Sequence, residues 1–553
     1  YAKCGMLSRA QMVFDRLLVR NVVTWNALIA GYGLHERFHE ALTCYERMRK
    51  EGFSPDIVTF ICLLKACGCV KGGIKKGEQI HDEIVSTGLL EKDVVLGSAL
   101  VDMYAKCGMI RRAQQVLEEI PIRNIFSWSS LIQGYVQMDQ GQEALNCFDR
   151  MRSEGLSPDA ITFICVLKAC SKTGRIEIGE NIHAEIVRRG LLENDVVLGN
   201  ALLDMYAKCG ALAKTKRTFE EFSVRDLVSW NSLITGYASQ GRVDEALFYI
   251  EMMQIEGLFP DAVTYISILK ECGSTQRIDM GEQIHDDIVD TSLLEKNIIL
   301  GNALVDMYTK CGMLLKAQQV LEDLPFRDVI TWNALISGYA QQGQGHEALT
   351  CFKQMQSEGL SPDATTLVCI LKSCGSLGAM VEGIQIHEES ARSGWLYKDI
   401  PLGNTLIDMY AKCGLISKAQ EVLEGLPLRD VVSWTTLIGG YTQHGHNEKA
   451  IKCLSLMQLE HISPNVVTFV CSLKACANTG ALDKGIELHA EMARNGFLKK
   501  NTDIIVGTAL VDMYAKCGSL TKAYEVFCLL PSHDVTSWNS LITGHLWHGH
   551  NKE

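Results

Sequence analysis

Apolar residues recur along this chain at steps of three and four positions and do not alternate with polar ones. Ala99, Leu100, Met103 and Tyr104 are one example. This period predicts amphipathic helices, whereas a half-buried strand would alternate every second residue. The pattern therefore predicts an all-α protein.

The predicted helices group into hairpins of three lengths. The first complete hairpin is Val22 to Asp56, the second Ile57 to Asp93 and the third Val94 to Asn124. The first closes with Gly-Phe-Ser-Pro-Asp, in which the proline cannot continue a helix and the aspartate can cap the next one. The same order of hairpins returns four more times.

A fixed period links these hairpins. The sequence Tyr-Ala-Lys-Cys-Gly, or its threonine variant, starts at Tyr1, Tyr104, Tyr206, Tyr308, Tyr410 and Tyr514, at steps of 102 to 104 residues. Such self-similarity predicts a solenoid, in which each unit buries its apolar face against its neighbours. We expect a partial short hairpin at 1–21, modules at 22–124, 125–226, 227–328, 329–430 and 431–534, and a partial hairpin at 535–553. The chain starts and stops within a module, so we expect it to be a fragment.

The composition is consistent with a helical repeat protein. The 21 cysteines occur singly at fixed repeat positions and are interpreted as small buried residues in a reducing compartment. No apolar run approaches the roughly 20 residues that a membrane span needs. Trp25, Trp128, Trp230, Trp332, Trp434 and Trp538 occupy one equivalent position, which predicts inter-hairpin core.

Four motifs in a fixed order carry a resemblance. These are Trp-Asn-Ala-Leu-Ile, Gly-Leu-Ser-Pro-Asp, Gln-Ile-His and Asp-Met-Tyr-Ala-Lys-Cys-Gly. With the three hairpin lengths, they resemble pentatricopeptide repeat proteins of the plant PLS subclass, in which P-type, long and short motifs alternate. Tetratricopeptide arrays share the two-helix architecture but not these motifs. The resemblance implies a right-handed superhelical solenoid of helix-turn-helix repeats, whose first helices line a groove for single-stranded RNA at one base per repeat.

In that family the fifth and the last residue of a motif read the base. Aspartate accepts from the ring N–H of uracil or guanine, and asparagine donates to the bare ring nitrogen of adenine or cytosine. A short Ser or Thr at position five leaves room for a purine, whereas Asn reaches a pyrimidine. The predicted pairs are Asn26 with Asp56 (U), Ser98 with Asn124 (A), Ser129 with Asp159 (G), Asn200 with Asp226 (U), Asn231 with Asp261 (U), Asn302 with Asp328 (U), Asn333 with Asp363 (U), Asn404 with Asp430 (U), Thr435 with Asn465 (A), and Thr508 with Asp534 (G). Asn539 has no partner in this chain and indicates a pyrimidine.

The fifth residues of the long motifs cannot form hydrogen bonds through their side chains. They are Ile61, Ile164, Ile266, Val368 and Val470, and no base is assigned to them. The predicted target is therefore U-n-A-G-n-U-U-n-U-U-n-U-A-n-G-Y. Helix capping alone would also explain residues such as Asp56 and Asp159. Capping does not require Asn, Ser or Thr at the fifth position of all ten complete P-type and short motifs, which favours base reading.

A net charge of −12 is unusual for a nucleic-acid binder, since phosphate contacts call for basic residues. Lysines recur on the predicted groove face at position 13 of the short motifs, as possible phosphate contacts: Lys106, Lys208, Lys310, Lys412 and Lys516. Others recur at position 9 of the long motifs: Lys65, Lys168, Lys270, Lys372 and Lys474. The alternative for the short-motif lysines is an ion pair with the aspartate four residues earlier, such as Asp102.

One enzyme signal is rejected. His-x-Glu occurs at His81, His183, His387 and His489, but the Pro-Cys-x-x-Cys that accompanies it in zinc deaminases is absent from the sequence. We therefore predict no metal, no cofactor and no catalytic residue in this chain.

The resemblance implies sequence-specific RNA binding that selects a cytidine for conversion to uridine in a mitochondrial or chloroplast transcript, with other editing factors as candidate partners and no membrane. A deaminase domain would lie beyond this chain or act in trans. The alternatives are a stabilisation, splicing or processing factor, and a protein-interaction scaffold.

Overall fold

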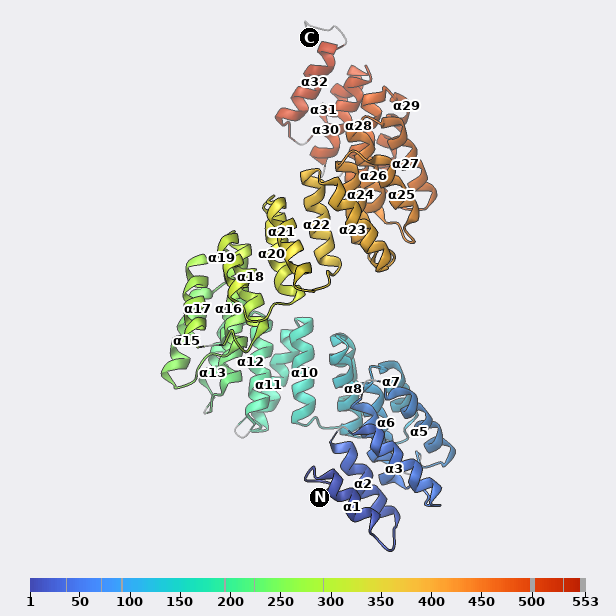
Figure 1. The fold of residues 1–553 in the computed structure, drawn as a ribbon, viewed down its shortest axis with the longest axis vertical. Helices are drawn as coiled ribbons and strands as arrows, with labels where there is room; N and C mark the ends of the chain where they lie inside the picture. Colours follow the sequence, from blue (N-terminus) through green and yellow to red (C-terminus); the bar gives the residue numbers. More distant parts are fainter. Residues whose placement is uncertain are drawn as a thin grey trace. The chain divides into compact units, whose positions relative to one another are not determined.

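The computed structural model describes residues 1–547 except 36, 71, 91–92, 193–194, 223, 292, 498–502 and 531. These residues form the helices α1 to α32 and a short 3-10 turn at Trp395–Tyr397, without a strand (Figure 1). The all-α prediction is confirmed. The chain divides into two compact units, Tyr1–Glu271 and Cys272–Glu553, and the boundary falls within α16.

Even-numbered helices are the first helices of the hairpins. They are α2 (Val22–Leu34), α4 (Ile57–Gly68), α6 (Val94–Lys106), α8 (Ile125–Gln137), α10 (Ala160–Thr173), α12 (Val196–Lys208), α14 (Leu227–Ser239), α16 (Ala262–Thr275), α18 (Ile298–Lys310), α20 (Val329–Gln341), α22 (Ala364–Leu377), α24 (Ile400–Lys412), α26 (Val431–Gln443), α28 (Val466–Thr479), α30 (Asp503–Lys516) and α32 (Val535–Trp547).

Odd-numbered helices are the second helices. They are α1 (Leu7–Asp15), α3 (Phe38–Lys50), α5 (Ile74–Ser86), α7 (Ile110–Glu119), α9 (Gly141–Ser153), α11 (Ile176–Arg188), α13 (Leu212–Glu220), α15 (Val243–Ile255), α17 (Ile278–Asp290), α19 (Leu314–Asp323), α21 (Gly345–Ser357), α23 (Met380–Arg392), α25 (Ile416–Gly425), α27 (Asn447–Leu459), α29 (Leu482–Arg494) and α31 (Leu520–Cys528).

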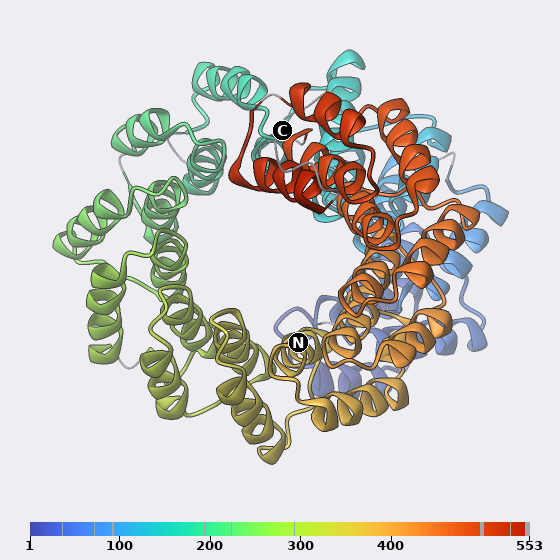
Figure 2. The same cartoon turned by 90° about the horizontal axis from the view of Figure 1, so that it is seen from above.

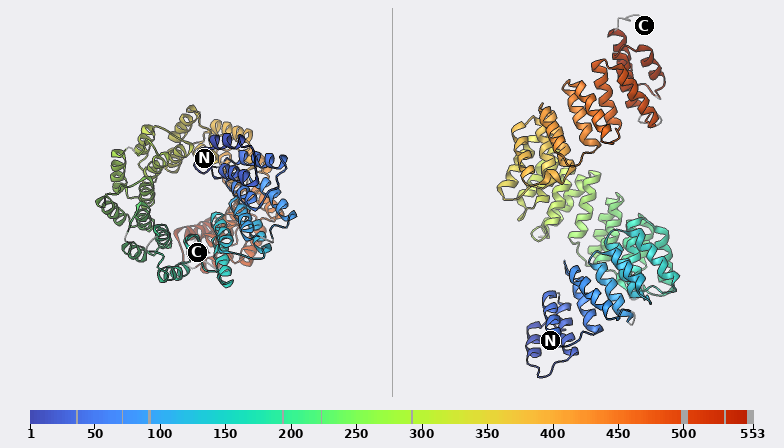
Figure 3. Two further views of the ribbon diagram at one scale, coloured as in Figure 1. Left: turned by 90° about the horizontal axis from the view of Figure 1, so that it is seen from below. Right: turned by 90° about the vertical axis from the view of Figure 1, so that its right-hand side faces the viewer.

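Each unit is built in two layers. First helices lie against the first helices of the next hairpins, as α2 against α4 and α4 against α6 in the first unit, and α20 against α22 and α22 against α24 in the second. Second helices lie against their own first helix and the one that follows, as α9 against α8 and α10. Figures 2 and 3 show these two rows of helices within each unit. The first helices therefore form one continuous layer in each unit.

The repeated tryptophans join consecutive modules. Trp128 is fully buried, and its Nε1 donates a 2.9 Å hydrogen bond to Oε2 of Glu154, whose Oε1 accepts a 2.6 Å hydrogen bond from Arg123. The same triad recurs around Trp332 and Trp434. The core assignment is confirmed at five of the six positions, because all but Trp538, which is half exposed, are buried.

The Tyr and Ala of the recurrent Tyr-Ala-Lys-Cys-Gly sequence join neighbouring hairpins, and its Gly ends the helix. The Tyr410 hydroxyl lies 2.8 Å from Nδ1 of His387, on the preceding second helix, and the same pairing recurs with Tyr104, Tyr206, Tyr308 and Tyr514. Ala411 lies so near Gly440, in the next first helix, that a Cβ added to that glycine would be 2.8 Å from the alanine Cβ. Gly414 ends the helix with a φ of +79°, which only glycine adopts without strain.

The cysteines are not crosslinked. All 21 lie within the part of the chain that the structure describes, and none of them forms a disulfide there. Cys413, for example, has its Sγ 3.9 Å from the backbone oxygen of Cys374 in the neighbouring first helix. Among the described helices, none is long and apolar enough to cross a membrane.

Candidate nucleic-acid interface

The predicted base-reading residues meet where consecutive first helices begin. Each fifth residue lies in the first turns of one first helix, and the last residue of its motif caps the start of another. The fifth residues are less exposed than side chains on an open helix face: Asn26 is 6% exposed and Ser98 is 1% exposed. The neighbouring first helix covers them, because the first helices pack side by side.

Every predicted asparagine–aspartate pair is hydrogen-bonded. In each pair the asparagine Nδ2 donates to the aspartate carboxylate. The shortest distances are 2.8 Å for Asn26 and Asp56, 3.0 Å for Asn200 and Asp226, 3.1 Å for Asn231 and Asp261, 3.2 Å for Asn302 and Asp328, 3.0 Å for Asn333 and Asp363, and 3.1 Å for Asn404 and Asp430. The structure thus brings together residues 26 or 30 positions apart in the sequence.

The serine and threonine pairs are arranged differently. Ser98 Oγ donates directly to Oδ1 of Asn124 at 3.0 Å. Ser129 reaches Asp159 through the hydroxyl of Thr162, by two contacts of 2.6 Å. Thr435 and Asn465 are bridged in the same way by Thr468, at 2.6 and 2.9 Å.

The last predicted sites are not paired in this way. The structure gives no hydrogen bond between Thr508 and Asp534, and Oγ1 of Thr508 is buried without a partner among the described residues. Asn539 is exposed on α32. These sites therefore lack the bonded geometry found at the other nine.

The last residues also cap helices, as the alternative interpretation expected. Oδ1 of Asp56 accepts from the backbone N–H of Thr59 at 2.8 Å, within a capping box at the start of α4. Burial acts to raise the pKa of Asp56, but the hydrogen bonds from Thr59 and Asn26 outweigh it, so the pKa lies below its usual value. The same balance lowers the pKa of Asp226 and Asp430. These carboxylates are therefore ionised acceptors at neutral pH.

A row of exposed apolar side chains lies three residues before the fifth positions. These second residues of the motifs are between 51% and 71% exposed, and comprise Val23, Val58, Val95, Phe126, Ile161, Val197, Val228, Val263, Ile299, Ile330, Val432, Val467 and Ile505. Residues three apart share one face of a helix, so this row borders the reading pairs. The helical period places these positions on that face, but it does not predict their exposure.

The two sets of repeated lysines differ. Every short-motif lysine forms an ion pair with the aspartate four residues earlier, at 2.7 to 2.9 Å: Lys106 with Asp102, Lys208 with Asp204, Lys310 with Asp306, Lys412 with Asp408 and Lys516 with Asp512. The long-motif lysines, typified by Lys372 on α22, are all exposed, and the described residues give them no ion pair. In the free chain, the short-motif lysines therefore form the ion pairs that were the alternative to phosphate contact.

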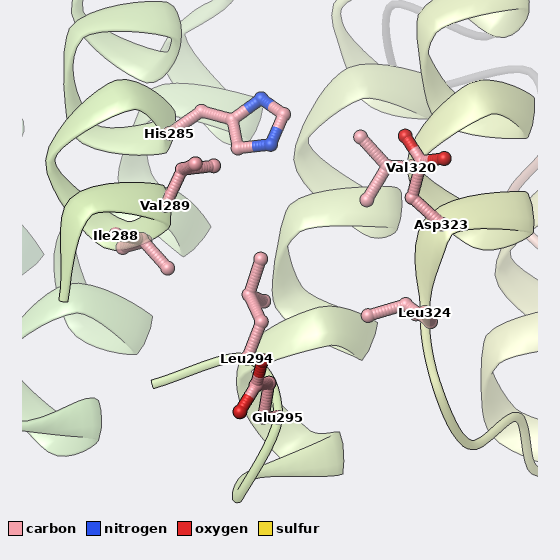
Figure 4. Close-up of a pocket in the computed structure, with 8 residues that line it drawn as sticks. All are labelled: His285, Ile288, Val289, Leu294, Glu295, Val320, Asp323 and Leu324. Atoms are coloured by element: carbon pink, nitrogen blue, oxygen red, sulfur yellow. The ribbon is translucent and has the colours of Figure 1, made fainter. Parts of the chain in front are cut away.

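A cavity beside one of the repeated histidines lies between second helices. It measures about 280 Å³ and is bordered by His285 on α17, Val320 on α19 and Leu324 beyond it (Figure 4). Burial is the main cause that lowers the pKa of His285. Across the described ranges, no cluster of three or more His, Cys, Asp or Glu residues could hold a metal ion.

Comparisons with known proteins agree with this architecture. The PPR repeat family model matches residues 20–69, 123–172, 225–274, 327–376 and 429–478, and a PPR repeat model matches 98–125, 161–191, 302–329, 404–431 and 508–535. A mitochondrial pentatricopeptide repeat-containing protein of Arabidopsis thaliana is 32% identical over 98% of this chain and 78% of its own length. A chloroplastic relative from the same plant is 34% identical over 96% of this chain and 60% of its own length.

Solved structures share the fold. The crystal structure of the pentatricopeptide repeat protein PPR10 from maize has a TM-score of 0.62 and 20% identity, over 98% of this chain and 83% of its own. The structure of PPR10 in complex with an 18-nt psaJ RNA element has a TM-score of 0.51 and 18% identity, over 100% and 88%. On its repeats, its relatives and its helical solenoid fold, this chain belongs to the pentatricopeptide repeat family.

Proposed function

We propose that this chain binds single-stranded RNA with sequence specificity, and that its P-type and short motifs each read one base. The observation that carries the proposal is the pairing of fifth and last residues. At nine of the ten complete predicted sites, directly or through one hydroxyl, these side chains are joined by hydrogen bonds. That PPR10 has been crystallised with an RNA element supports the same conclusion.

The pairs retain groups with which a base can bond. In the Asn26 site, Oδ1 of Asp56 carries the hydrogen bonds from Thr59 and Asn26, whereas Oδ2 has none from the described residues. A carboxylate oxygen accepts from the ring N–H of uracil, and the second N–H of the asparagine amide can donate to a pyrimidine carbonyl. The pair therefore suits U, with C as second choice.

The exposed apolar second residues and the long-motif lysines can contact RNA without sequence preference. Exposed apolar second residues such as Val23 can pack against base faces, since every base has one. Long-motif lysines such as Lys372 can contact phosphates without first breaking an ion pair. We assign phosphate contacts first to the long motifs, and to the short-motif lysines only where RNA displaces the aspartate.

The finer assignment follows the PLS pattern of the sequence. We propose five P-long-short modules, with the boundaries given above, that position a cytidine in an organellar transcript for C-to-U editing. The deaminase would act from another domain or another protein. Relatives named mitochondrial and chloroplastic support an organellar site of action.

Binding to U-n-A-G-n-U-U-n-U-U-n-U-A-n-G-Y tests the proposal. The chain should bind this RNA more tightly than scrambled RNAs of the same composition, in competition at fixed salt. Equal affinity for target and scrambled RNA would contradict base reading.

A further inference from the structure

At most of the reading sites, the third residue of the motif that follows touches both members of the pair. In the site of Asn333 and Asp363, Thr366 Oγ1 lies 2.5 Å from the asparagine Oδ1 and 3.0 Å from the aspartate Oδ1. The Thr366 side chain is fully buried, so water does not compete for these contacts.

The same contact to the fifth residue occurs at seven of the ten sites. The third residue lies 2.5 to 2.6 Å from the fifth in the pairs Thr59 with Asn26, Thr162 with Ser129, Ser229 with Asn200, Thr264 with Asn231, Thr366 with Asn333, Ser433 with Asn404, and Thr468 with Thr435. At the other three sites the third residue bonds only to the last residue, as Thr331 to Asp328. In one of those, Oδ1 of Asn302 is buried without a partner among the described residues.

The hydroxyl is present after motifs to which a base is assigned and absent after motifs to which none is assigned, and the helix cap forms in both cases. After every P-type and short motif the third residue is Ser or Thr, whereas after the five long motifs it is Leu96, Leu198, Leu300, Leu402 and Val506. These apolar residues are equally buried. The cap survives without the hydroxyl, since Asp399 still accepts from the backbone N–H of Leu402 at 2.9 Å.

An asparagine amide has a donor end and an acceptor end of nearly the same shape, so its orientation must be set by its surroundings. In the Asn333 site the carboxylate of Asp363 accepts from Nδ2, and the hydroxyl of Thr366 donates to Oδ1. The reversed amide would place its oxygen against the carboxylate. The carboxylate, which can only accept, therefore sets the orientation, and the hydroxyl stabilises it by donating to Oδ1.

We propose that the third residue of the following motif is a positioning residue for base reading. Its buried hydroxyl holds the fifth residue in one orientation and thereby increases discrimination between bases. This proposal rests on the proposed function. It also accounts for the long motifs, which lack a polar fifth residue and are each followed by a motif without the hydroxyl at its third position.

The test uses the full chain and RNAs that differ only at base 10, which is assigned to Asn333 and Asp363. Thr366→Val removes the hydroxyl with little change in shape, Thr366→Ser retains it, and Leu402→Val alters the equivalent buried position where no base is assigned. We expect Thr366→Val to reduce the preference for U at base 10 by about fivefold, the worth of one hydrogen bond, while preferences elsewhere persist. Thr366→Ser and Leu402→Val should keep the preference at base 10.

The outcomes separate the two proposals. If the wild-type chain shows no preference at base 10, base reading at this site fails. If the wild type prefers U and Thr366→Val retains that preference in full, base reading stands and the positioning role is overturned. An equal loss of affinity for all RNAs would show a structural role only and would also overturn it. Thr264→Val, scored at base 7, repeats the measurement should Thr366→Val reduce helicity.

Discussion

Nδ2 of Asn333 lies 3.0 Å from each carboxylate oxygen of Asp363, so the two residues are bonded before any RNA arrives. On the proposed assignment, an arriving base therefore meets a pair whose side chains are already ordered. Since little side-chain entropy remains to be lost, this arrangement favours discrimination over adaptability. It also makes each pair a unit, in which a change at one residue alters the hydrogen bonds of the other.

Asn26→Ser should change the base preference at the first position of the target. The shorter side chain leaves room for a purine while Asp56 remains an acceptor, so preference shifts from U towards G. Competition with RNAs that differ at base 1 should show a change of about tenfold, as expected for one base contact. Ile61→Val, at the fifth position of a long motif, is the matched control and should leave all preferences unchanged; an unaltered base 1 preference in Asn26→Ser would count against base reading.

The two rows of lysines should differ in the salt dependence of RNA binding. Lys372→Gln removes an exposed cation without an ion pair among the described residues, whereas Lys412→Gln removes one that is 2.7 Å from Asp408. The slope of log affinity against log salt should fall by about 0.7 for Lys372→Gln and by less for Lys412→Gln. The same slope in both variants as in the wild type would remove both rows from the interface.

The close approach between the repeated Ala and the following first helix predicts a loss of stability. A Cβ at Gly440 would lie 2.8 Å from the Cβ of Ala411, which is fixed to its backbone, so Gly440→Ala should destabilise the chain by about 1–3 kcal/mol. Gly439→Ala is the control, because its nearest neighbour is Sγ of Cys471 at 3.8 Å, and it should be neutral or stabilising by about 1 kcal/mol. Denaturant unfolding measures both changes.

A double variant checks the cause of that loss. Adding Ala411→Gly to Gly440→Ala moves the methyl group from one helix to the other and should restore part of the lost stability. If it restores none, the packing explanation is wrong.

The half-buried histidines should make stability depend on pH. Burial lowers the pKa of His285 below its usual 6.5, while the charges of Asp286 and Asp323 oppose that shift only partly. The unfolded chain therefore takes up the proton first, so the contribution of this group to stability is complete above pH 6.5 and declines as the pH falls towards the lower folded value. His285→Gln should have a smaller difference in melting temperature between pH 7.5 and 5.5 than the wild type. An identical difference would show that this histidine does not contribute.

The sequence predicts much of the fold, because helix period, capping residues and a repeat are local signals. Trp128 could be assigned to the core from its recurrence, and Asp56 could be assigned as a cap from the turn before it. The ion pair of Lys412 remained one of two alternatives, since spacing on a helix allows a pair but does not show whether the lysine points to its neighbour or to solvent.

The third residues illustrate what the sequence alone did not reveal. Thr366 is three residues after a helix cap, where Ser or Thr is ordinary capping-box chemistry. Its contact with Asn333 spans 33 positions and exists only because α20 and α22 lie side by side. A comparison of third residues between motif types would have found the signal, since leucine or valine replaces the hydroxyl residue after every long motif.

The replacement of that hydroxyl by Leu402 and its equivalents has a consequence for the evolution of targets. On the proposed assignment, specificity comes from two of every three nucleotides, and the third can mutate without loss of recognition. A transcript can therefore accumulate substitutions at regular intervals while this protein still binds it. Natural targets should show a three-nucleotide rhythm of constraint that is independent of any codon reading frame.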